Sequence, residues 1–217
     1  MKTTISIIVF LFTLQLAAQD IITDRPDQTE SSSTLQKNFF QMEGGFLYYD
    51  DKENDGDGWL APSVLFRYGL SNALEIRLVT EYQSNKYNLG MMGSSSTIAG
   101  LSDLQVGMKL QLLDNENAST QMAFLSHFVL PTAKSELSNG SLGMITKLAI
   151  SHDLKSNFSL GYNVGYDYLG EENFLTYSVA LGIGLADQLG CFLEPYGAYG
   201  ENGAFESNFN VGFTYLL

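Results

Sequence analysis

Cysteine, histidine and basic residues are scarce in this sequence, and each shortage excludes a class of function. One cysteine permits neither an internal disulfide nor a cysteine-rich zinc site. Lys and Arg number 11 against 24 Asp and Glu, and a net charge of −13 leaves no basic face for nucleic acid. Charged residues make up 16% of the 217, whereas ordinary soluble domains have roughly 25%. The chain is instead rich in Gly, Tyr and Phe, with 21, 12 and 14 residues, so it is too aromatic to be disordered.

Long hydrophobic runs are also missing beyond the N-terminus, so no transmembrane helix is expected. The apolar run Ile5–Leu16 follows a short basic start and precedes two alanines. This order is typical of a secretory signal peptide, and the run is too short to cross a bilayer. We therefore expect an exported protein with a signal peptide over 1–18, an N-terminal segment over 19–37 and a folded domain over 38–217.

The rest of the chain alternates with a period of two residues. In Phe158–Tyr168, every even position is large and apolar or aromatic, and every odd position is Ser, Gly, Asn or Asp. In Leu74–Tyr82, the same alternation places Glu75, Arg77 and Glu81 on one face. A helix would scatter these three charges around its axis, so both runs are predicted to be strands.

About ten such runs follow one another, most of them longer than the 5–6 residues usual for strands in globular proteins. A tilted strand that crosses a bilayer needs about 9–11 residues. Short turns alternate with longer polar loops, as in outer-membrane barrels, where the short turns are periplasmic. The prediction is an all-β fold, an antiparallel transmembrane β-barrel. Its strands are expected near 38–49, 58–69, 73–83, 100–113, 119–130, 142–152, 157–168, 174–186, 190–200 and 208–217.

The two faces of these strands are predicted to meet different surroundings. The apolar face would contact lipid, and Tyr and Phe near the strand ends would lie at headgroup level. The alternative is a soluble β-sandwich or barrel with the apolar face inside. Its outer face would usually carry more charge than the Gly, Ser, Asn and Gln found here.

Several short motifs resemble one known family. Thr23-Asp24-Arg25-Pro26, followed by Thr29-Glu30-Ser31, resembles the start of a family of outer-membrane transporters named for the MetA pathway of phenol degradation. Further matches, in order, are Arg67-Tyr68-Gly69-Leu70, Glu75-Ile76-Arg77, Gly100-Leu101-Ser102-Asp103-Leu104, Leu130-Pro131-Thr132 and Glu194 with Tyr196-Gly197. The resemblance implies an exported, channel-like barrel rather than an enzyme.

The C-terminus departs from that family. Its members typically continue for another hairpin and finish with an aromatic residue, whereas this sequence stops at Leu217. Either the barrel has ten strands with an atypical end, or a last hairpin is missing and the complete barrel has about twelve strands.

Charged residues on the polar face are the main functional candidates. Inside a small barrel they must pair or line water, because an unpaired buried charge is costly. Arg67 and Arg77 lie on neighbouring strands with Glu75 between them, which predicts an Arg–Glu network. It would form either salt bridges that close the lumen or a selectivity ring in a pore. The candidates are Arg67, Glu75, Arg77, Glu81, Lys109, Lys147, Asp167 and Glu194.

The N-terminal segment shows no alternation and carries four charges, Asp24, Arg25, Asp27 and Glu30. If it folds into the lumen, Arg25 could pair with Glu75 or Glu194, and the segment would be a plug or gate. The alternative is a mobile periplasmic leader.

Metal binding and catalysis have little support, and no cofactor is expected. The acidic run 50–58 imitates the start of an EF-hand loop, but Pro62 stands where the ligand Glu is needed. His127 and Ser126 are adjacent in a strand, so they point to opposite faces and cannot form a dyad. No Gly-x-Ser-x-Gly motif is present. We therefore do not expect an enzyme.

These observations favour a channel for passive passage of small, hydrophobic or aromatic molecules in the outer membrane of a Gram-negative bacterium. The expected partners are outer-membrane lipid, the barrel assembly machinery and a small-molecule substrate that the sequence does not identify, with no nucleic acid. The alternatives are a closed structural or adhesive barrel and a lipid-modifying enzyme.

Overall fold

The structure is a computed structural model that describes residues 21–25, 28–51, 56–88, 95–114, 119–154, 157–170, 172–201 and 203–216. The predicted signal peptide, Asp27 and residues 52–55 of the acidic run 50–58 therefore lie outside the described residues. No helix in the described part of the chain is long and apolar enough to cross a membrane.

The described residues form one curled, entirely antiparallel sheet. Ten strands follow chain order across it, and β4 is the exception, because it pairs beside β3 off this path. The strands are β1 (Phe40–Asp51), β2 (Gly56–Ser71), β3 (Leu74–Asn88), β4 (Ser95–Leu101), β5 (Leu104–Asp114), β6 (Thr120–Leu130), β7 (Gly143–Asp153), β8 (Phe158–Leu169), β9 (Glu172–Ala186), β10 (Leu189–Gly200) and β11 (Phe205–Tyr215). The predicted all-β, antiparallel fold is confirmed.

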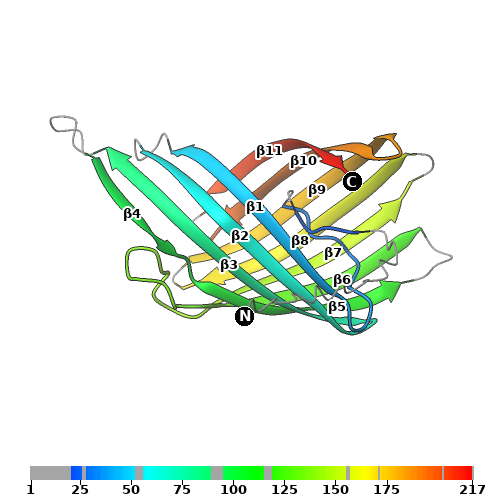
Figure 1. The fold of residues 1–217 in the computed structure, drawn as a ribbon, viewed down its shortest axis with the longest axis horizontal. Helices are drawn as coiled ribbons and strands as arrows, with labels where there is room; N and C mark the ends of the chain where they lie inside the picture. Colours follow the sequence, from blue (N-terminus) through cyan, green and yellow to red (C-terminus); the bar gives the residue numbers. More distant parts are fainter. Residues whose placement is uncertain are drawn as a thin grey trace, which may run out of the picture.

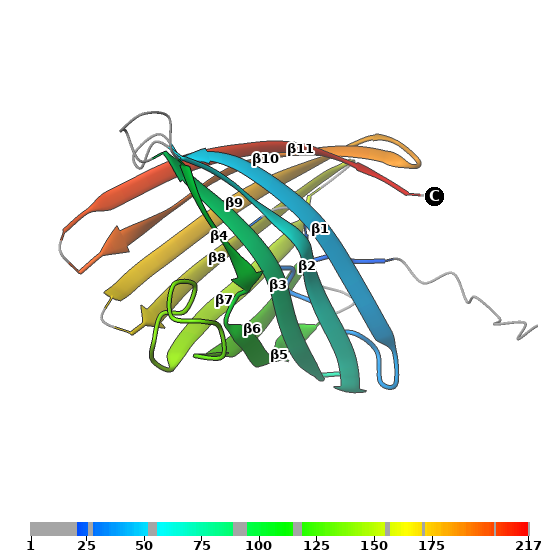
Figure 2. The ribbon, with the colours of Figure 1, turned by 60° about the vertical axis from the view of Figure 1, so that its left-hand side comes forward.

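The sheet curls into a half-barrel (Figures 1 and 2). β1–β3 stand opposite β7–β9 across an interior, and the N-terminal segment, in blue, lies within the curve. Within the described residues, β1 pairs only with β2 and β11 only with β10, so the sheet does not close on itself there.

One strand was not predicted from the sequence. β3 is long enough to pair with β5 through Leu74–Val79 and with β4 through Tyr82–Asn88. One strand was predicted near 100–113. In the structure, Ser102 and Asp103 lie outside any strand and separate β4 from β5. Ser95–Leu101 has no period-two alternation, which is why no strand was predicted between those near 73–83 and 100–113.

The two faces of the sheet carry opposite kinds of side chain. Among the largest fully buried side chains in the described residues, five are charged, and Leu125 is the single apolar one. On the other face, Ile76, Met108 and Val164 are 43%, 50% and 53% exposed. Soluble proteins show the reverse, with apolar side chains inside and charged ones outside. The polar face is therefore the concave one, as the alternation along the strands predicted.

Residues 35–39 join the N-terminal segment to β1 by folding tightly over the end of β2. Asn38 donates its backbone N–H to the Gly69 carbonyl at 2.8 Å, and Gly69 donates to Phe39 at 3.0 Å. A Cβ added at Gly69 would overlap the carbonyl oxygen of Gln36. Glycine at this position therefore allows the chain to leave the interior and enter β1.

Replacing Gly69 by alanine should destabilise the fold by about 1–3 kcal/mol, because backbone must move to admit the new methyl group. Thermal unfolding in detergent, followed by circular dichroism, measures the loss. Gly44→Ala is the matched control, since a Cβ at Gly44 in β1 meets no atom within 4 Å. Equal melting temperatures for the two variants would contradict the close approach at Gly69.

Candidate functional site

The N-terminal segment, meaning residues 21–25 and 28–35, lies against the concave face of the sheet. Its polar contacts reach β1, β2, β3 and β5 on one side of the interior and β7, β8, β9 and β10 on the other. The segment therefore spans the curl of the sheet rather than following one strand.

The register of the strands brings together the charged side chains on the concave face of the sheet, which forms the wall of the interior. The two-residue turn at Asn72 and Ala73 joins β2 to β3 and sets Arg67 directly opposite Arg77. In the next pair of strands, Glu75 of β3 lies opposite Lys109 of β5. Two arginines opposite each other repel, so this register requires carboxylates between them.

Asp24 supplies the central carboxylate. Its Oδ2 lies 2.6 Å from Arg77 Nη1, 2.8 Å from Lys109 Nζ and 3.3 Å from Arg67 Nη1. The Asp24 side chain is 0% exposed, and those of the three cations are at most 1% exposed. Buried charges are stable only when paired and hydrogen-bonded, so Asp24 and these cations depend on one another.

Two wall carboxylates hold Arg67. Glu75 accepts from Arg67 Nε at 2.8 Å and from Arg67 Nη2 at 3.0 Å. This is a bidentate contact, which is among the stronger hydrogen-bonded ion pairs. Glu43 accepts from Arg67 Nη1 at 2.9 Å and also from the backbone N–H of Asp24 at 2.9 Å. Glu75 reaches the segment too, through the N–H of Leu35 at 2.9 Å.

Glu30 completes the cluster from the segment. Its Oε2 accepts from Arg77 Nη2 at 2.7 Å and lies 3.7 Å from Lys109 Nζ. Lys109 also donates to the backbone oxygen of Ser31 at 3.0 Å. We call Asp24, Glu30, Glu43, Glu75, Arg67, Arg77 and Lys109 together the buried charge cluster.

A second anchor holds the segment on the opposite wall. Glu194 of β10, which is 0% exposed, accepts from the backbone N–H of Gln28 at 3.0 Å and of Thr29 at 2.7 Å. Asn163 of β8 accepts from the N–H of Glu30 at 2.7 Å and donates to its carbonyl at 3.1 Å. Glu194 therefore binds backbone and not a cation.

Arg25 takes a different partner from those considered in the sequence analysis. Its Nη2 lies 3.6 Å from Glu81, and its Nη1 donates to Ser63 at 2.6 Å. The pairing of Arg25 with Glu75 or Glu194 is therefore wrong. Glu75 is occupied by Arg67, and Glu194 is occupied by the backbone at Gln28 and Thr29.

The remaining sequence candidates lie apart from the buried charge cluster. Lys147 of β7 donates to the carbonyl of Gln28 at 3.3 Å. Asp167 of β8 has one buried carboxylate oxygen with no hydrogen-bond partner. His127, on the concave face of β6, makes a side-chain hydrogen bond through Nδ1 to Gln105 at 3.3 Å. No group of three or more His, Cys, Asp or Glu in the described ranges is arranged to hold a metal ion.

Glu43, Asn163 and Ser178 are site residues that the sequence analysis did not select. Ser178 accepts from the Thr29 hydroxyl at 2.9 Å. Each lies at a polar position of a period-two strand, which was the available signal. Glu43 in particular shares the polar face of β1 with Gln41, whose side chain contacts it at 3.0 Å.

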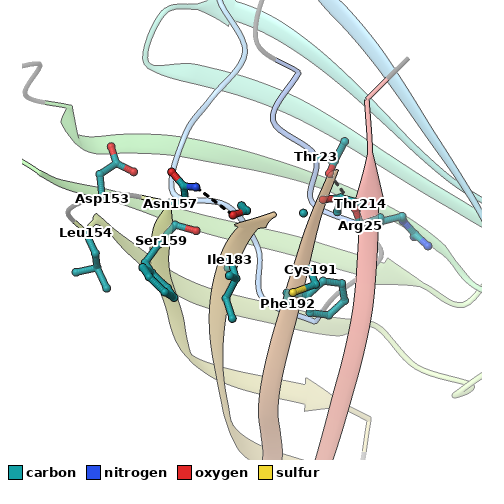
Figure 3. A pocket seen from close by; sticks show the side chains of 14 residues that line it. Thr23, Arg25, Asp153, Leu154, Asn157, Ser159, Ile183, Cys191, Phe192 and Thr214 are labelled. Carbon is teal, nitrogen blue, oxygen red and sulfur yellow. Dashed lines mark hydrogen bonds between the residues drawn. The ribbon is translucent and has the colours of Figure 1, made fainter. Parts of the chain in front are cut away.

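Cavities lie on both sides of the segment along β8 and β10. One, of about 540 Å³, is lined by Thr23, Arg25 and the ends of strands near the short turns, Ser159 and Phe192 among them (Figure 3). The other, of about 190 Å³, is lined by Gln28 and by side chains farther along the same strands, such as Tyr196. On β10, Phe192 lines the first cavity and Tyr196 lines the second. Glu194, which binds the segment, lies between these two residues, so the segment crosses the interior between the cavities.

The neighbouring cations keep the carboxyl group of Asp24 ionised. Burial alone would raise the pKa of this carboxyl group, but Lys109, Arg77 and Arg67 outweigh it and hold the pKa well below its ordinary value of 3.8. Asp24 is therefore ionised wherever the segment is docked at neutral pH.

In a comparison with protein-family models, residues 23–217 match the family described as "Putative MetA-pathway of phenol degradation". The match begins at the Thr23 motif and agrees with the resemblance seen in the sequence. No match was found among curated proteins.

Asp24→Asn should destabilise the protein by about 3 kcal/mol, because it removes the buried carboxylate that contacts all three cations. The expected drop in melting temperature is about 6–12 °C, measured by circular dichroism in detergent. Asp187→Asn, at an exposed turn, is the matched control and should change stability by less than about 0.5 kcal/mol. A drop no larger than that of the control would contradict the role given to Asp24.

The stability difference between the wild type and Asp24→Asn should depend on pH. Because folding lowers the pKa of Asp24, its contribution is complete above the ordinary value of 3.8 and is lost as the pH falls toward the lowered pKa. The difference in melting temperature should therefore stay constant from neutral pH to about pH 5 and shrink below about pH 4. A difference that already disappears near pH 6 would contradict the lowered pKa.

Proposed function

Since the chain belongs to the family of the MetA pathway of phenol degradation, we propose that it is an outer-membrane β-barrel through which small molecules diffuse. The observation that carries this proposal is the polar interior, which is hollow on both sides of the N-terminal segment. Passage of this kind needs no covalent step, so the proposal assigns no enzymatic activity.

The outward face supports a place in a lipid bilayer. Large apolar side chains cover it on most strands, and the fold and family fit an outer-membrane barrel. Strands other than β4 are 11–16 residues long, which is enough to cross a bilayer at a tilt. Exposed Tyr48, Tyr68, Tyr168 and Tyr215 lie near strand ends, where aromatic girdles meet the headgroups. In this proposal a signal peptide exports the chain, and the barrel assembly machinery inserts it.

The N-terminal segment is the gate in this proposal. It crosses between the two cavities and is attached to both walls through the buried charge cluster and Glu194. Movement of the segment would join the cavities into one path. Phe192 and Tyr196 contribute aromatic surface to these cavities, which suits the small hydrophobic or aromatic molecules proposed as solutes.

One observation favours a closed structural barrel as the second candidate. The ion pairs that hold the segment are almost completely buried, and breaking one buried pair typically costs about 3–5 kcal/mol. Several such contacts acting together would keep the interior shut at all times.

Conductance in planar bilayers and swelling of proteoliposomes in arabinose separate the two candidates. Asp24→Asn combined with Glu30→Gln should raise the fraction of open channels on the order of a hundredfold, because about 3 kcal/mol of docking free energy is lost. The control is Glu172→Gln combined with Asp187→Asn, which removes two exposed carboxylates and should behave as the wild type. Silence of both the wild type and the cluster variant in both assays would refute the channel and favour the closed barrel.

A further inference from the structure

Lys109 has no partner of its own in the wall of the sheet. Its contacts in the described residues are with Asp24 at 2.8 Å, Glu30 at 3.7 Å and the backbone oxygen and hydroxyl of Ser31 at 3.0 and 3.3 Å. All three residues belong to the N-terminal segment. Lys109 is nevertheless 0% exposed, so the wall holds a buried cation that the segment alone satisfies.

The register offers Lys109 a wall carboxylate, but that carboxylate is occupied elsewhere. Glu75 lies directly opposite Lys109 in the β3–β5 pair. Both of its oxygens instead accept from Arg67, at 2.8 and 3.0 Å. The wall part of the cluster therefore has three cations, Arg67, Arg77 and Lys109, against the two carboxylates of Glu43 and Glu75. It carries one uncompensated positive charge.

Two carboxylates of the docked segment, Asp24 and Glu30, face this wall, and Asp24 is the central one. Its carboxylate touches all three cations and is completely buried, whereas the Glu30 side chain is 16% exposed and meets two of them from the edge. Displacement of the segment would leave the three cations facing an open interior with a deficit of one negative charge. A desolvated site with that deficit favours an anion of one charge.

We propose that Arg67, Arg77 and Lys109 form a binding site for a small carboxylate anion, and that Asp24 and Glu30 fill this site while the segment is docked. The inference rests on the proposed function only in supposing that the segment moves. A carboxylate is the matching chemistry, because carboxylates occupy the site in the closed state and because guanidinium groups recognise this planar anion. The 540 Å³ cavity reaches the segment beside the site, since Thr23 and Arg25, on either side of Asp24, line it, and Arg67 itself lines a smaller cavity of about 60 Å³.

A carboxylate solute and the segment carboxylates would occupy the same site, and this has two consequences. A carboxylate solute and the segment compete for the same three cations, so a bound solute favours the displaced segment. The solutes proposed for the channel are then narrowed to those that carry a carboxylate on a small hydrophobic or aromatic body.

Chemical rescue tests the site without requiring transport. In Asp24→Ala, the protein loses the carboxylate but keeps the cations, and sodium acetate is then titrated to about 0.1 M at an ionic strength held constant with NaCl. Acetate should raise the melting temperature by about 3–6 °C at ten times its Kd, because a ligand that binds the folded state stabilises it. The wild type, whose site is filled by Asp24 and Glu30 together, should show no such rise.

Removal of the wall cation provides the matched control. Asp24→Ala combined with Lys109→Met should lose the acetate response, since the remaining wall cations, Arg67 and Arg77, keep Glu43 and Glu75 as partners, and the cation that depends on the segment is gone. If Asp24→Ala does not fold, Glu30→Ala, at the partly exposed edge of the site, is titrated in the same way. No acetate response in the folded variant, or an equal response in the wild type or in the variant lacking Lys109, would overturn the proposal.

The outcome is independent of the conductance measurements. Acetate rescue without conductance in any variant would support the proposed anion site and refute the proposed channel. Conductance in the cluster variant without acetate rescue would retain the channel and refute the anion site.

Discussion

The carboxylate of Asp24, shared by Arg67, Arg77 and Lys109, is the interaction on which the interior of this sheet depends. The register of β2 and β3 sets the two arginines opposite each other, and Glu75, the wall carboxylate that contacts both, leaves Lys109 without a carboxylate partner in the wall as described. A residue from outside the sheet must therefore enter the concave face. Because the Asp24 side chain is 0% exposed, it exchanges its hydration for contacts with these three cations and with the Ser31 N–H. The segment and the wall are thus two halves of one charged core.

Such a core is compatible with the rest of the fold because the apolar side chains are on the opposite face. A sheet that turns Ile76, Met108 and Val164 outward has little apolar surface left with which to fill its interior. Polar contacts must then supply the order that hydrophobic packing supplies in a soluble barrel. The ion pairs at Asp24 and the backbone contacts at Glu194 perform this role from opposite walls.

Sequence reasoning recovered the parts of the site that depend on periodicity. The alternation places Glu75 and Arg77 on one face, and a short turn brings Arg67 beside them, so their network was predictable. The segment has no period, and the partner of Arg25 depends on how an irregular chain crosses the interior, so Glu81 was a candidate but was not identified as that partner. β4 was missed for a similar reason, because Ser95–Leu101 does not alternate and gains its strand structure by pairing with the extended end of β3.

The same interactions that hold the segment determine what can release it. Thermal motion that pulled Asp24 away would expose three buried cations with two wall carboxylates, and that state is costly unless another anion enters. Water entering from the 540 Å³ cavity would lower this cost in part. A carboxylate solute would lower it more, since it restores the missing charge at the same atoms. In the proposed channel, a gate built from carboxylates on a cationic wall is therefore most easily opened by the anions that it resembles.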